Sequence, residues 1–453
     1  VGAMMACYLA KRGYKVDIYE RRTDIRLMEV VRGRSINLAL SCRGREALRG
    51  VGLEAEISKN GIPMRARMIH DLNDQRRPIP YGTKDQYIMS IDRRLLNEVL
   101  LTAAEKYPNV RIFFSHKLVS CDFEKGEAEF CNEKGDTMRI HVDLIVGADG
   151  AYSSLRRQMM KRLFDYEQTY IPHGYMELNI PPNNNNEYAM ETNYLHIWPR
   201  NEFMMIALPN LDKSFTTTLF MPFEIFESLD TEEKLMQFFE EKFPDSIKLI
   251  GAEALKKTFF TSKALPMVSI KCKPYHVGDK SVIIGDAAHS MVPFYGQGMN
   301  CVSNLTINCS FLVNLYLCIF NSKALPEYTK MRHPDATAMC DLAMYNYVEM
   351  RSHVNSKLFL LRKKMDNFLH MLFPRTWIPL YTMVSFTRTR YHQCISRRAW
   401  QDKVINQGIT VSAVGGGVGL VLVAYWMHKS GSLSPVYDFV EDSVSKVQNW
   451  LKV

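Results

Sequence analysis

Hydrophobic positions along the chain alternate between short apolar runs and helical repeats, an order typical of an α/β fold. Residues 1–13 have the small and apolar composition of a helix that ends near Gly13, and residues 14–20 follow as a strand. Residues 92–105 predict an amphipathic helix with Asp92 as its N-cap. Residues 142–156 predict a buried strand that runs into a Gly-Asp-Gly turn and a helix.

The pattern changes to aromatic, alternating runs between residues 170 and 223. Turn-forming segments such as residues 181–186 and 199–201 separate these runs, and alternation with a period of two indicates strands with one buried face. We therefore expect an antiparallel sheet that covers a substrate. Residues 231–243 predict a helix, and residues 341–375 predict a long amphipathic helical stretch.

Composition limits the class of protein. With 453 residues the chain is long for one core, so two or three subdomains are expected. Charged residues make up 23% and hydrophobic residues 47%, which excludes bulk disorder. Ten cysteines occur without a Cys-x-x-Cys motif or metal-ligand spacing, so reduced intracellular thiols are expected and no metal site is predicted.

The net charge of +9 includes a basic cluster at Arg388, Arg390, Arg397 and Arg398. No nucleic-acid-binding motif accompanies it, so we interpret it as juxtamembrane or solvated. Residues 409–427 carry no charge over 19 positions, close to the length that spans a bilayer. We expect a C-terminal membrane anchor there. A buried helix is the alternative, and three consecutive glycines count against the anchor prediction.

Residues 1–20 read as the second half of a dinucleotide-binding β-α-β unit, in which a helix and a glycine turn precede a strand that ends in Glu20. Such a unit has an earlier strand and a G-x-G-x-x-G turn, of which Gly2 matches the last glycine. We therefore expect the first strand and two glycines to be missing from this sequence. Glu20 is expected to bond ribose hydroxyls, although a solvated strand-end Glu is the simpler alternative.

Residues 278–300 combine a β-branched strand, a Gly285-Asp286 turn and a loop containing Pro293, Gly296 and Gly298. Glycines lack a Cβ, so this loop allows close approach of a bound group to the backbone. The N-terminus of a following helix would face an anion. A strand-turn-helix corner without a ligand is the alternative for any single Gly-Asp pair.

Three elements stand in order along the chain: Gly2 with Glu20, the Gly147-Ala-Asp-Gly150 turn, and Gly285-Asp286. Their order and spacing resemble the FAD-dependent aromatic hydroxylases. Within that group, the segments at 34–40, 170–177, 195–200 and 344–355 are similar to the kynurenine hydroxylases, and the similarity runs from Val1 to about Arg398.

The resemblance implies an α/β fold in which a Rossmann-like FAD-binding domain is interleaved with an antiparallel substrate domain, followed by C-terminal helices and a membrane anchor. The expected ranges are 1–75, 92–165 and 276–340 for the FAD-binding part, 76–91 and 166–275 for the substrate part, 341–400 for the C-terminal helices, 401–430 for the anchor and 431–453 for a tail.

The resemblance also implies the chemistry. FAD reduced by NADPH reacts with O₂, and one oxygen atom is delivered to L-kynurenine to give 3-hydroxykynurenine in tryptophan degradation. The flavin supplies the chemistry, so no catalytic side chain is assigned, and His289 is read as packing. The family is anchored in the mitochondrial outer membrane with its catalytic part facing the cytosol, and the same is expected here.

Site residues are carried over by matching positions. A guanidinium binds a carboxylate with two parallel hydrogen bonds, and Arg67 matches the family's carboxylate-binding arginine. The other substrate-binding matches are Tyr81, Asn346 and Tyr381. The cofactor-binding matches are Val1, Gly2, Tyr19, Glu20, Arg21, Arg22, Ala39, Arg93, Leu118, Asp286, Met299 and Asn300.

The chain departs from the family just after Asn300, where Val302 stands in place of a glycine and Leu305 in place of an aspartate. We hypothesise that residues 301–320 reflect an alternative exon or a reading-frame error. Two further readings stay open: a related flavoprotein that hydroxylates another aromatic substrate, and an inactive membrane-anchored flavin-fold protein.

Overall fold

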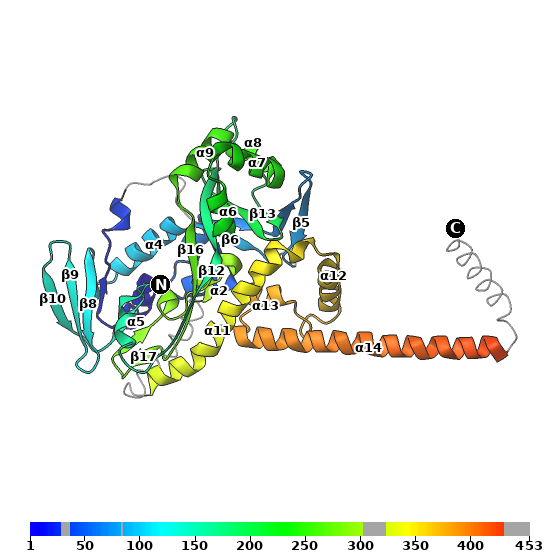
Figure 1. Ribbon diagram of the computed structural model, residues 1–453. Helices are drawn as coiled ribbons and strands as arrows, with labels where there is room; N and C mark the ends of the chain where they lie inside the picture. Colours follow the sequence, from blue (N-terminus) through cyan, green and yellow to red (C-terminus); the bar gives the residue numbers. More distant parts are fainter. Residues whose placement is uncertain (29–36, 83–84, 302–322, 430–453) are drawn as a thin grey trace. The chain divides into compact units, whose positions relative to one another are not determined.

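The computed structural model describes residues 1–28, 37–82, 85–301 and 323–429, apart from the side chains at 409 and 411–428 (Figure 1). The divergent residues 302–322 and the segment 34–36 lie outside the described residues. Contacts between Cα atoms divide the chain into two compact units, Val1–Cys394 and Ile395–Val453.

A seven-stranded sheet is the largest sheet of the first unit, in the order β16-β12-β15-β14-β13-β4-β5. Its central ladders are antiparallel, as the alternating aromatic runs predict, but β4 pairs with β13 in parallel. The strands are β4 (Ala66–His70), β5 (Arg76–Pro80), β12 (Asp165–Ile180), β13 (Tyr194–Arg200), β14 (Phe203–Pro209), β15 (Phe215–Pro222) and β16 (Leu265–Lys273).

Four smaller sheets make up the other side of this unit. The parallel pairs β1-β7 and β11-β18 belong to two of them, as expected for α/β units. Their strands are β1 (Val16–Tyr19), β2 (Asn37–Leu40), β3 (Ile62–Met64), β6 (Ile88–Asp92), β7 (Val110–Phe113), β8 (His116–Asp122), β9 (Glu127–Asn132), β10 (Thr137–His141), β11 (Ile145–Gly147), β17 (His276–Val277) and β18 (Ser281–Ile283).

Strand pairing crosses the boundary that was expected near residue 75 between the FAD-binding part and the substrate part. Strand β4 lies before that position yet joins the seven-stranded sheet, whereas β6 pairs with β2 and β3. The reason is that β4 is buried at every position, so it needs a covered place inside a sheet. Arg67 on β4 is thereby placed beside Leu195 of β13, 128 positions later in the chain.

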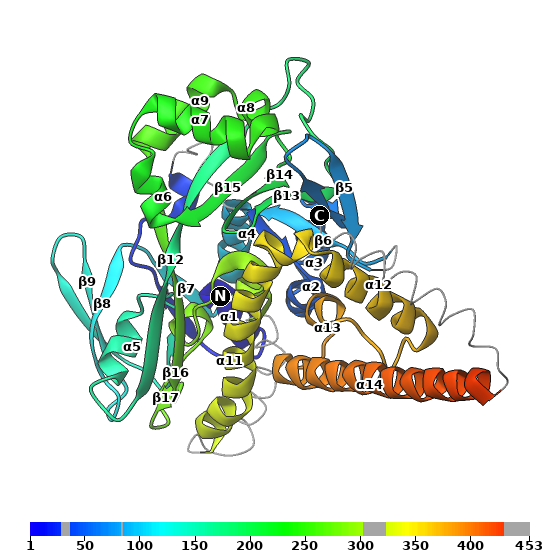
Figure 2. The same ribbon diagram turned by 45° about the vertical axis from the view of Figure 1, so that its right-hand side comes forward.

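Helices pack around these sheets (Figures 1 and 2). The helices α7 to α9 bury Leu235, Phe239 and Leu255 in one apolar core with the large sheet, and α11 lies against β13 and β16. The α-helices of the first unit are α1 (Gly2–Ala10), α2 (Cys42–Gly50), α3 (Glu54–Lys59), α4 (Arg93–Glu105), α5 (Ser154–Met159), α6 (Phe223–Ser228), α7 (Glu232–Lys242), α8 (Pro244–Ile250), α9 (Ala252–Thr261), α11 (Ala324–Arg351), α12 (Lys357–Leu372) and α13 (Leu380–Phe386).

Short 3₁₀ turns connect several of these elements, and two of them carry the loop expected to approach a ligand. They are η1 (Ile25–Leu27), η2 (Gly285–Ala287), η3 (Pro293–Tyr295) and η4 (His353–Asn355). The expected helical stretch at 341–375 is interrupted by η4. The interruption has a local cause, because the Ser356 hydroxyl accepts a hydrogen bond from the Phe359 amide and so starts α12 as a separate helix.

Helix α14 (Tyr391–Lys429) contains most of the expected anchor segment 401–430. The described residues contain no helix that is both long and apolar enough to cross a membrane. The side chains at 409 and 411–428, on which the anchor prediction depends, lie outside the described part of the chain.

Candidate functional site

Arg67 is the charged centre of a buried cluster that joins the seven-stranded sheet to α11 and α13. Its side chain is 2% exposed. One terminal nitrogen, Nη1, donates to Glu349 Oε1 at 2.8 Å, and Nη2 donates to Asn346 Oδ1 at 3.3 Å. The Nε atom of this buried guanidinium has no hydrogen-bond partner in the described chain, so one donor is left for a ligand.

Three tyrosines form a stack beside this arginine. Tyr81 and Tyr381 have ring centroids 5.3 Å apart, and Tyr295 stacks on the other side of Tyr381 at 5.4 Å. The guanidinium carbon of Arg67 lies 4.5 Å from the Tyr381 ring centroid, a cation–π distance. The buried Tyr81 hydroxyl makes no hydrogen bond of ordinary geometry to the described residues, which leaves a second donor close to Arg67.

The electrostatics of this cluster keep Arg67 charged and its neighbouring tyrosines neutral. Burial opposes the charge of Arg67, but the Glu349 carboxylate and the neighbouring phenols together raise its pKa, so the guanidinium is cationic at all relevant pH values. Burial raises the pKa of Tyr81 well above its ordinary value and also raises the pKa of Tyr381. Both phenols therefore stay neutral and can donate hydrogen bonds.

Asn346 connects the arginine to the loop that contains Phe294. Its Nδ2 donates to the Phe294 carbonyl at 2.7 Å, while its Oδ1 accepts from Arg67. Helical spacing on α11 places Asn346 and Glu349 three residues apart on one face, so both side chains reach the same guanidinium.

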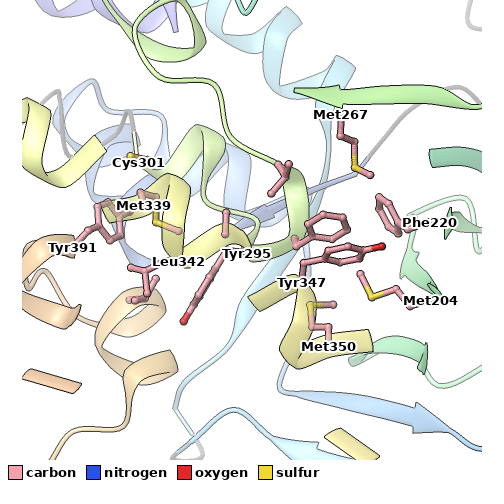
Figure 3. Packing of buried hydrophobic residues seen from close by; sticks show 14 of the residues in the cluster. Met204, Phe220, Met267, Tyr295, Cys301, Met339, Leu342, Tyr347, Met350 and Tyr391 are labelled. Atoms are coloured by element: carbon pink, nitrogen blue, oxygen red, sulfur yellow. The ribbon is translucent and has the colours of Figure 1, made fainter. Parts of the chain in front are cut away.

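Aromatic side chains lie next to the polar cluster of Arg67, Asn346 and Glu349. The Phe294 and Tyr347 rings stack with centroids 3.8 Å apart, and Phe220 meets Phe294 edge-on at 4.9 Å. Figure 3 shows Phe220 and Tyr347 with three methionines near them, namely Met204, Met267 and Met350, which belong to the same buried cluster. A ligand with an anionic end and an aromatic ring matches such surroundings.

A second cluster surrounds the Gly285-Asp286 turn. Gly285 has φ +63, and a Cβ on it would lie 3.2 Å from the Val1 side chain. A Cβ on Gly2 would lie 3.4 Å from Ala148, next to the second glycine turn. Dense surrounding protein raises the pKa of Asp286, opposed by the positive charge of Arg93, although the carboxylate keeps exposed surface. These chain segments meet closely enough to cradle one extended ligand.

Asn300 holds the ligand-facing loop against β2 and α2. It is fully buried, its Oδ1 accepts from the Ser41 amide at 2.9 Å, and its Nδ2 donates to the Ala39 carbonyl at 2.6 Å. Gly296 has φ +62, and a Cβ there would come within 2.8 Å of Ala39. A Cβ on Gly298 would meet nothing within 4 Å, so the backbone at Gly298 is open to a ligand.

The other expected cofactor contacts lie around the end of β1, on β8, at the start of α4 and in the loop after η3. Tyr19 is sandwiched between Phe113 and Phe130 at 4.8 and 4.0 Å, which is a packing role. The Glu20 carboxylate is exposed and accepts a hydrogen bond from the Arg22 amide at 2.9 Å, so it lies at the strand end where a ribose hydroxyl is expected. Arg21, Arg22 and Arg93 are exposed, and Leu118 and Met299 are partly buried.

The four expected substrate-binding residues therefore come together, and the expected cofactor-binding residues lie on neighbouring turns and strand ends. The residues present fit a flavin. Gly285 and Gly296 have positive φ, the backbone at Gly298 is open, and the carboxylates of Asp286 and Glu20 are exposed, so each of these positions can accept part of the cofactor. Sequence reasoning missed Glu349 and Phe294. Glu349 lay inside a matched segment, but only its burial beside Arg67 distinguishes it from an ordinary helix-surface glutamate.

His289, which was read as packing, is almost completely buried. Burial lowers its pKa well below the ordinary value, and Arg332 Nη2 lies 3.5 Å from its Nε2. It is therefore a neutral residue of the core between the loop and α11.

Comparison with known proteins agrees with this geometry. The profile of the FAD binding domain family matches residues 1–343, which is most of the chain. Kynurenine 3-monooxygenase of Sus scrofa is 55% identical over 410 residues, covering 90% of this chain and 87% of that protein. The Anopheles gambiae enzyme of the same name is 52% identical, covering 92% and 87%.

Solved structures show the same fold at low identity. A probable FAD-dependent monooxygenase from Pseudomonas aeruginosa superposes with a TM-score of 0.61 at 20% identity, covering 77% of this chain and 93% of that chain. The tetrameric form of 2-methyl-3-hydroxypyridine-5-carboxylic acid oxygenase gives 0.62 at 18% identity, covering 79% and 92%. With a flavoprotein fold at low identity and named relatives above 50% identity over nearly the whole chain, this protein belongs to the kynurenine 3-monooxygenase family of FAD-binding proteins.

Proposed function

We propose that this chain hydroxylates L-kynurenine to 3-hydroxykynurenine with FAD as cofactor and NADPH and O₂ as co-substrates. In the balanced reaction, L-kynurenine, NADPH, a proton and O₂ give 3-hydroxykynurenine, NADP⁺ and water. The observation that carries the proposal is the buried Arg67, which is held by Glu349 and Asn346 and lies beside an aromatic wall.

The substrate carries a carboxylate, an ammonium group and an aminophenyl ring, and the site has a complementary group for each. The free Nε donor of Arg67 and the Tyr81 hydroxyl bind the carboxylate. The Glu349 carboxylate, 2.8 Å from Arg67 Nη1, binds the ammonium group. The ring lies among Phe294, Tyr347 and Phe220, where an apolar surrounding excludes water from the attacked carbon.

Bound FAD supplies the redox chemistry that takes electrons from NADPH and activates O₂. The side chains of this chain bind, orient and desolvate. Asp286 and Asn300 place the cofactor against the loop at 293–300, and Phe294 of the same loop faces the ring site. The amino group of the substrate already activates the ring, so a nucleophilic side chain is not needed.

The direct test is to express the full chain and measure bound FAD by absorbance, and 3-hydroxykynurenine by chromatography. Arg67→Ala is expected to keep its flavin but to raise KM by roughly 10- to 150-fold, because hydrogen bonds to charged groups contribute about 1.5–3 kcal/mol. Arg76→Ala, at an exposed ion pair with Glu191, is the matched control and should change KM less than twofold.

Three outcomes separate the alternatives. Colourless protein without bound flavin would favour the inactive flavin-fold reading. Flavin-loaded protein whose NADPH oxidation is stimulated by a different aromatic substrate would favour the related hydroxylase. An unchanged KM in Arg67→Ala would contradict the carboxylate assignment.

We further propose that residues 401–430 anchor the protein in the mitochondrial outer membrane, with the first unit facing the cytosol. The uncharged run at 409–427 and the helical backbone of α14 support this proposal. Alkaline carbonate extraction of isolated mitochondria and protease protection test it. Extraction into the soluble fraction, or protection of the first unit in intact mitochondria, would contradict it.

A further inference from the structure

Helix α12 carries a stripe of apolar side chains that faces solvent, in addition to half-buried apolar residues such as Leu360 that pack against the core. Leu358 is 78% exposed, Leu361 63% and Phe368 55%. Met371, Leu372 and the following Phe373 are also at least half exposed. Soluble proteins normally turn such a stripe toward the core, so this contiguous apolar face indicates an interaction surface.

Some polar side chains of α12 are turned inward, although Lys357 and Lys364 are exposed. Asp366 is buried and accepts hydrogen bonds from Arg362 Nε at 3.1 Å and from Trp377 Nε1 at 3.0 Å. The His370 ring bonds the Trp377 carbonyl at 2.6 Å. Leu360 packs against the buried core and Asp366 is buried, whereas Leu361 and Phe368 are exposed, so α12 has distinct inward and outward faces.

The spacing of the exposed residues places them on one line. Leu358, Leu361, Phe368 and Leu372 recur at intervals of three, seven and four residues, which correspond to one side of an α-helix. Lys357 and Lys364 are exposed beside the same stripe, and Arg375 is exposed just after the helix.

The charge of this part of the chain identifies what the stripe contacts. Between Arg351 and Trp400 the sequence has ten lysines and arginines and one carboxylate, Asp366. Arg388 and Arg390 form ion pairs with Glu46 and Asp335, and Arg397 and Arg398 belong to the second unit, so the exposed cations on or just after α12 are Lys357, Lys364 and Arg375. The single carboxylate is buried, so a partner meets apolar groups and positive charge, the combination that binds an anionic lipid surface.

We propose that α12 lies on the surface of an anionic phospholipid bilayer, with Leu361 and Phe368 inserted between headgroups and Lys357 and Lys364 at the phosphates. This inference rests on the proposed membrane attachment, to which it adds a second contact outside the 409–427 run. Because α13, the next helix, carries Tyr381, this contact holds the substrate-binding part of the first unit close to the membrane.

The test uses the full chain with the apolar run disrupted by Val421→Lys and Val423→Lys, so that α12 supplies the remaining contact. Its partition onto vesicles is measured by flotation, with phosphatidylcholine alone and with 30% phosphatidylserine (about one lipid in three) at low salt. We expect binding to the anionic vesicles that is lost in neutral vesicles and at high salt.

Three further variants are made in that background. Leu361→Gln with Phe368→Gln should lower the partition coefficient about tenfold or more, because two inserted side chains are lost. Lys357→Gln with Lys364→Gln should lower it about 25-fold, at roughly fivefold per cation. Leu163→Gln with Leu211→Gln, at exposed apolar positions elsewhere in the first unit, is the matched control and should bind like the background.

The test of α12 can be distinguished from a test of the proposed anchor at 409–427. Retention of the unmodified chain on neutral vesicles at high salt tests the 409–427 run, whereas salt-sensitive binding of the disrupted chain tests α12. The inference is overturned if the disrupted chain does not bind anionic vesicles, or if it binds unchanged after the Leu361 and Phe368 substitutions. It is also overturned if those substitutions abolish self-association in the absence of lipid, which would assign the stripe to a second copy.

Discussion

At the scale of single residues, Arg67 depends on a neighbour that the sequence did not reveal. Glu349 is 282 positions away along the chain, and its carboxylate is 2.8 Å from the guanidinium. An arginine that binds only a carboxylate needs no acid beside it, because the acid competes for the same donors. A zwitterionic ligand resolves this conflict, since its ammonium group pairs with Glu349 while its carboxylate pairs with Arg67.

The residue-scale prediction concerns Glu349→Gln. We expect KM for L-kynurenine to rise about 10-fold or more, the effect of losing one charge-assisted hydrogen bond. KM for 4-(2-aminophenyl)-4-oxobutanoate, which lacks the α-amino group, should change less than threefold. Steady-state NADPH oxidation with both compounds measures the difference.

Asp341→Asn on the same helix is the control, because that carboxylate makes an exposed ion pair with Lys271. Equal increases in KM for the two compounds would rule out an ammonium-binding role for Glu349.

The substrate residues were predictable only through matched motifs. Arg67, Tyr81, Asn346 and Tyr381 come from four separate segments, and no local pattern indicates that their side chains meet. The structure places them in one cluster, while their roles stay predictions. Glu349 was missed because a glutamate three residues after an asparagine is ordinary helical sequence, and its burial arises only from tertiary packing.

At the scale of elements, the sequence predicted the start of a helix correctly where one side chain forms hydrogen bonds with the nearby backbone. Asp92 was predicted to cap a helix, and its carboxylate accepts from the Arg94 and Leu95 amides at the start of α4. The parallel pairing of β4 with β13 was not predictable, because a uniformly buried five-residue run does not specify its neighbour.

Gly44 gives an element-scale prediction. It lies inside α2, where alanine normally favours a helix by about 1 kcal/mol. A Cβ at Gly44 would lie 2.3 Å from Leu40 Cδ1 and 2.5 Å from Asn300 Oδ1. Gly44→Ala should therefore displace Asn300 and raise the dissociation constant for FAD at least tenfold, measured by flavin fluorescence.

Gly408→Ala is the matched control, because Gly408 is also helical and a Cβ there would meet nothing within 4 Å. Equal FAD affinity in the Gly44→Ala and Gly408→Ala proteins would show that Asn300 does not position the cofactor loop.

A buried polar network between β4, β13 and α8 predicts a pH dependence of stability. His70 Nδ1 lies 2.8 Å from Asp245 Oδ2, and its Nε2 lies 2.9 Å from His196 Nδ1. Burial lowers the pKa of His196 to about 4, whereas the unfolded residue has its ordinary value near 6.5. Below about pH 6.5 His196 takes up a proton in the unfolded chain but not in the folded chain. Its contribution to the free energy of unfolding is therefore full above that pH and falls as the pH is lowered toward 4.

The loss is expected to be on the order of 3 kcal/mol in total, from a shift of roughly two pH units or more. Chemical unfolding at several pH values measures it. His196→Gln should flatten the curve between pH 6.5 and 4, and an unflattened curve would assign the loss to other groups.

At the scale of the whole molecule, the cofactor side is assembled from small separate sheets. The β1-β7 and β11-β18 pairs are not joined by strand pairing within the described residues, so a ligand that touches both adds a connection that the backbone lacks. FAD at 100 times its dissociation constant should raise the free energy of unfolding by about 2.7 kcal/mol. Urea unfolding with and without FAD measures this, and an equal midpoint would show that FAD does not bind the folded chain in preference to the unfolded chain.

The two hydrogen bonds of Asn346 have a thermodynamic consequence. Its amide oxygen accepts from Arg67, the proposed carboxylate ligand, and its amide nitrogen donates to the Phe294 carbonyl, in the loop proposed to contact the flavin. We therefore expect occupancy of either site to change the binding free energy of the other through this shared group. Such linkage is reciprocal, so the factor by which L-kynurenine alters the affinity for FAD equals the factor by which FAD alters the affinity for L-kynurenine. Calorimetry can measure the affinity for each ligand with and without the other, which gives the coupling free energy between the two sites. In the Asn346→Ala variant both factors should approach one, so the difference from the unmodified chain is the part of the coupling that Asn346 carries.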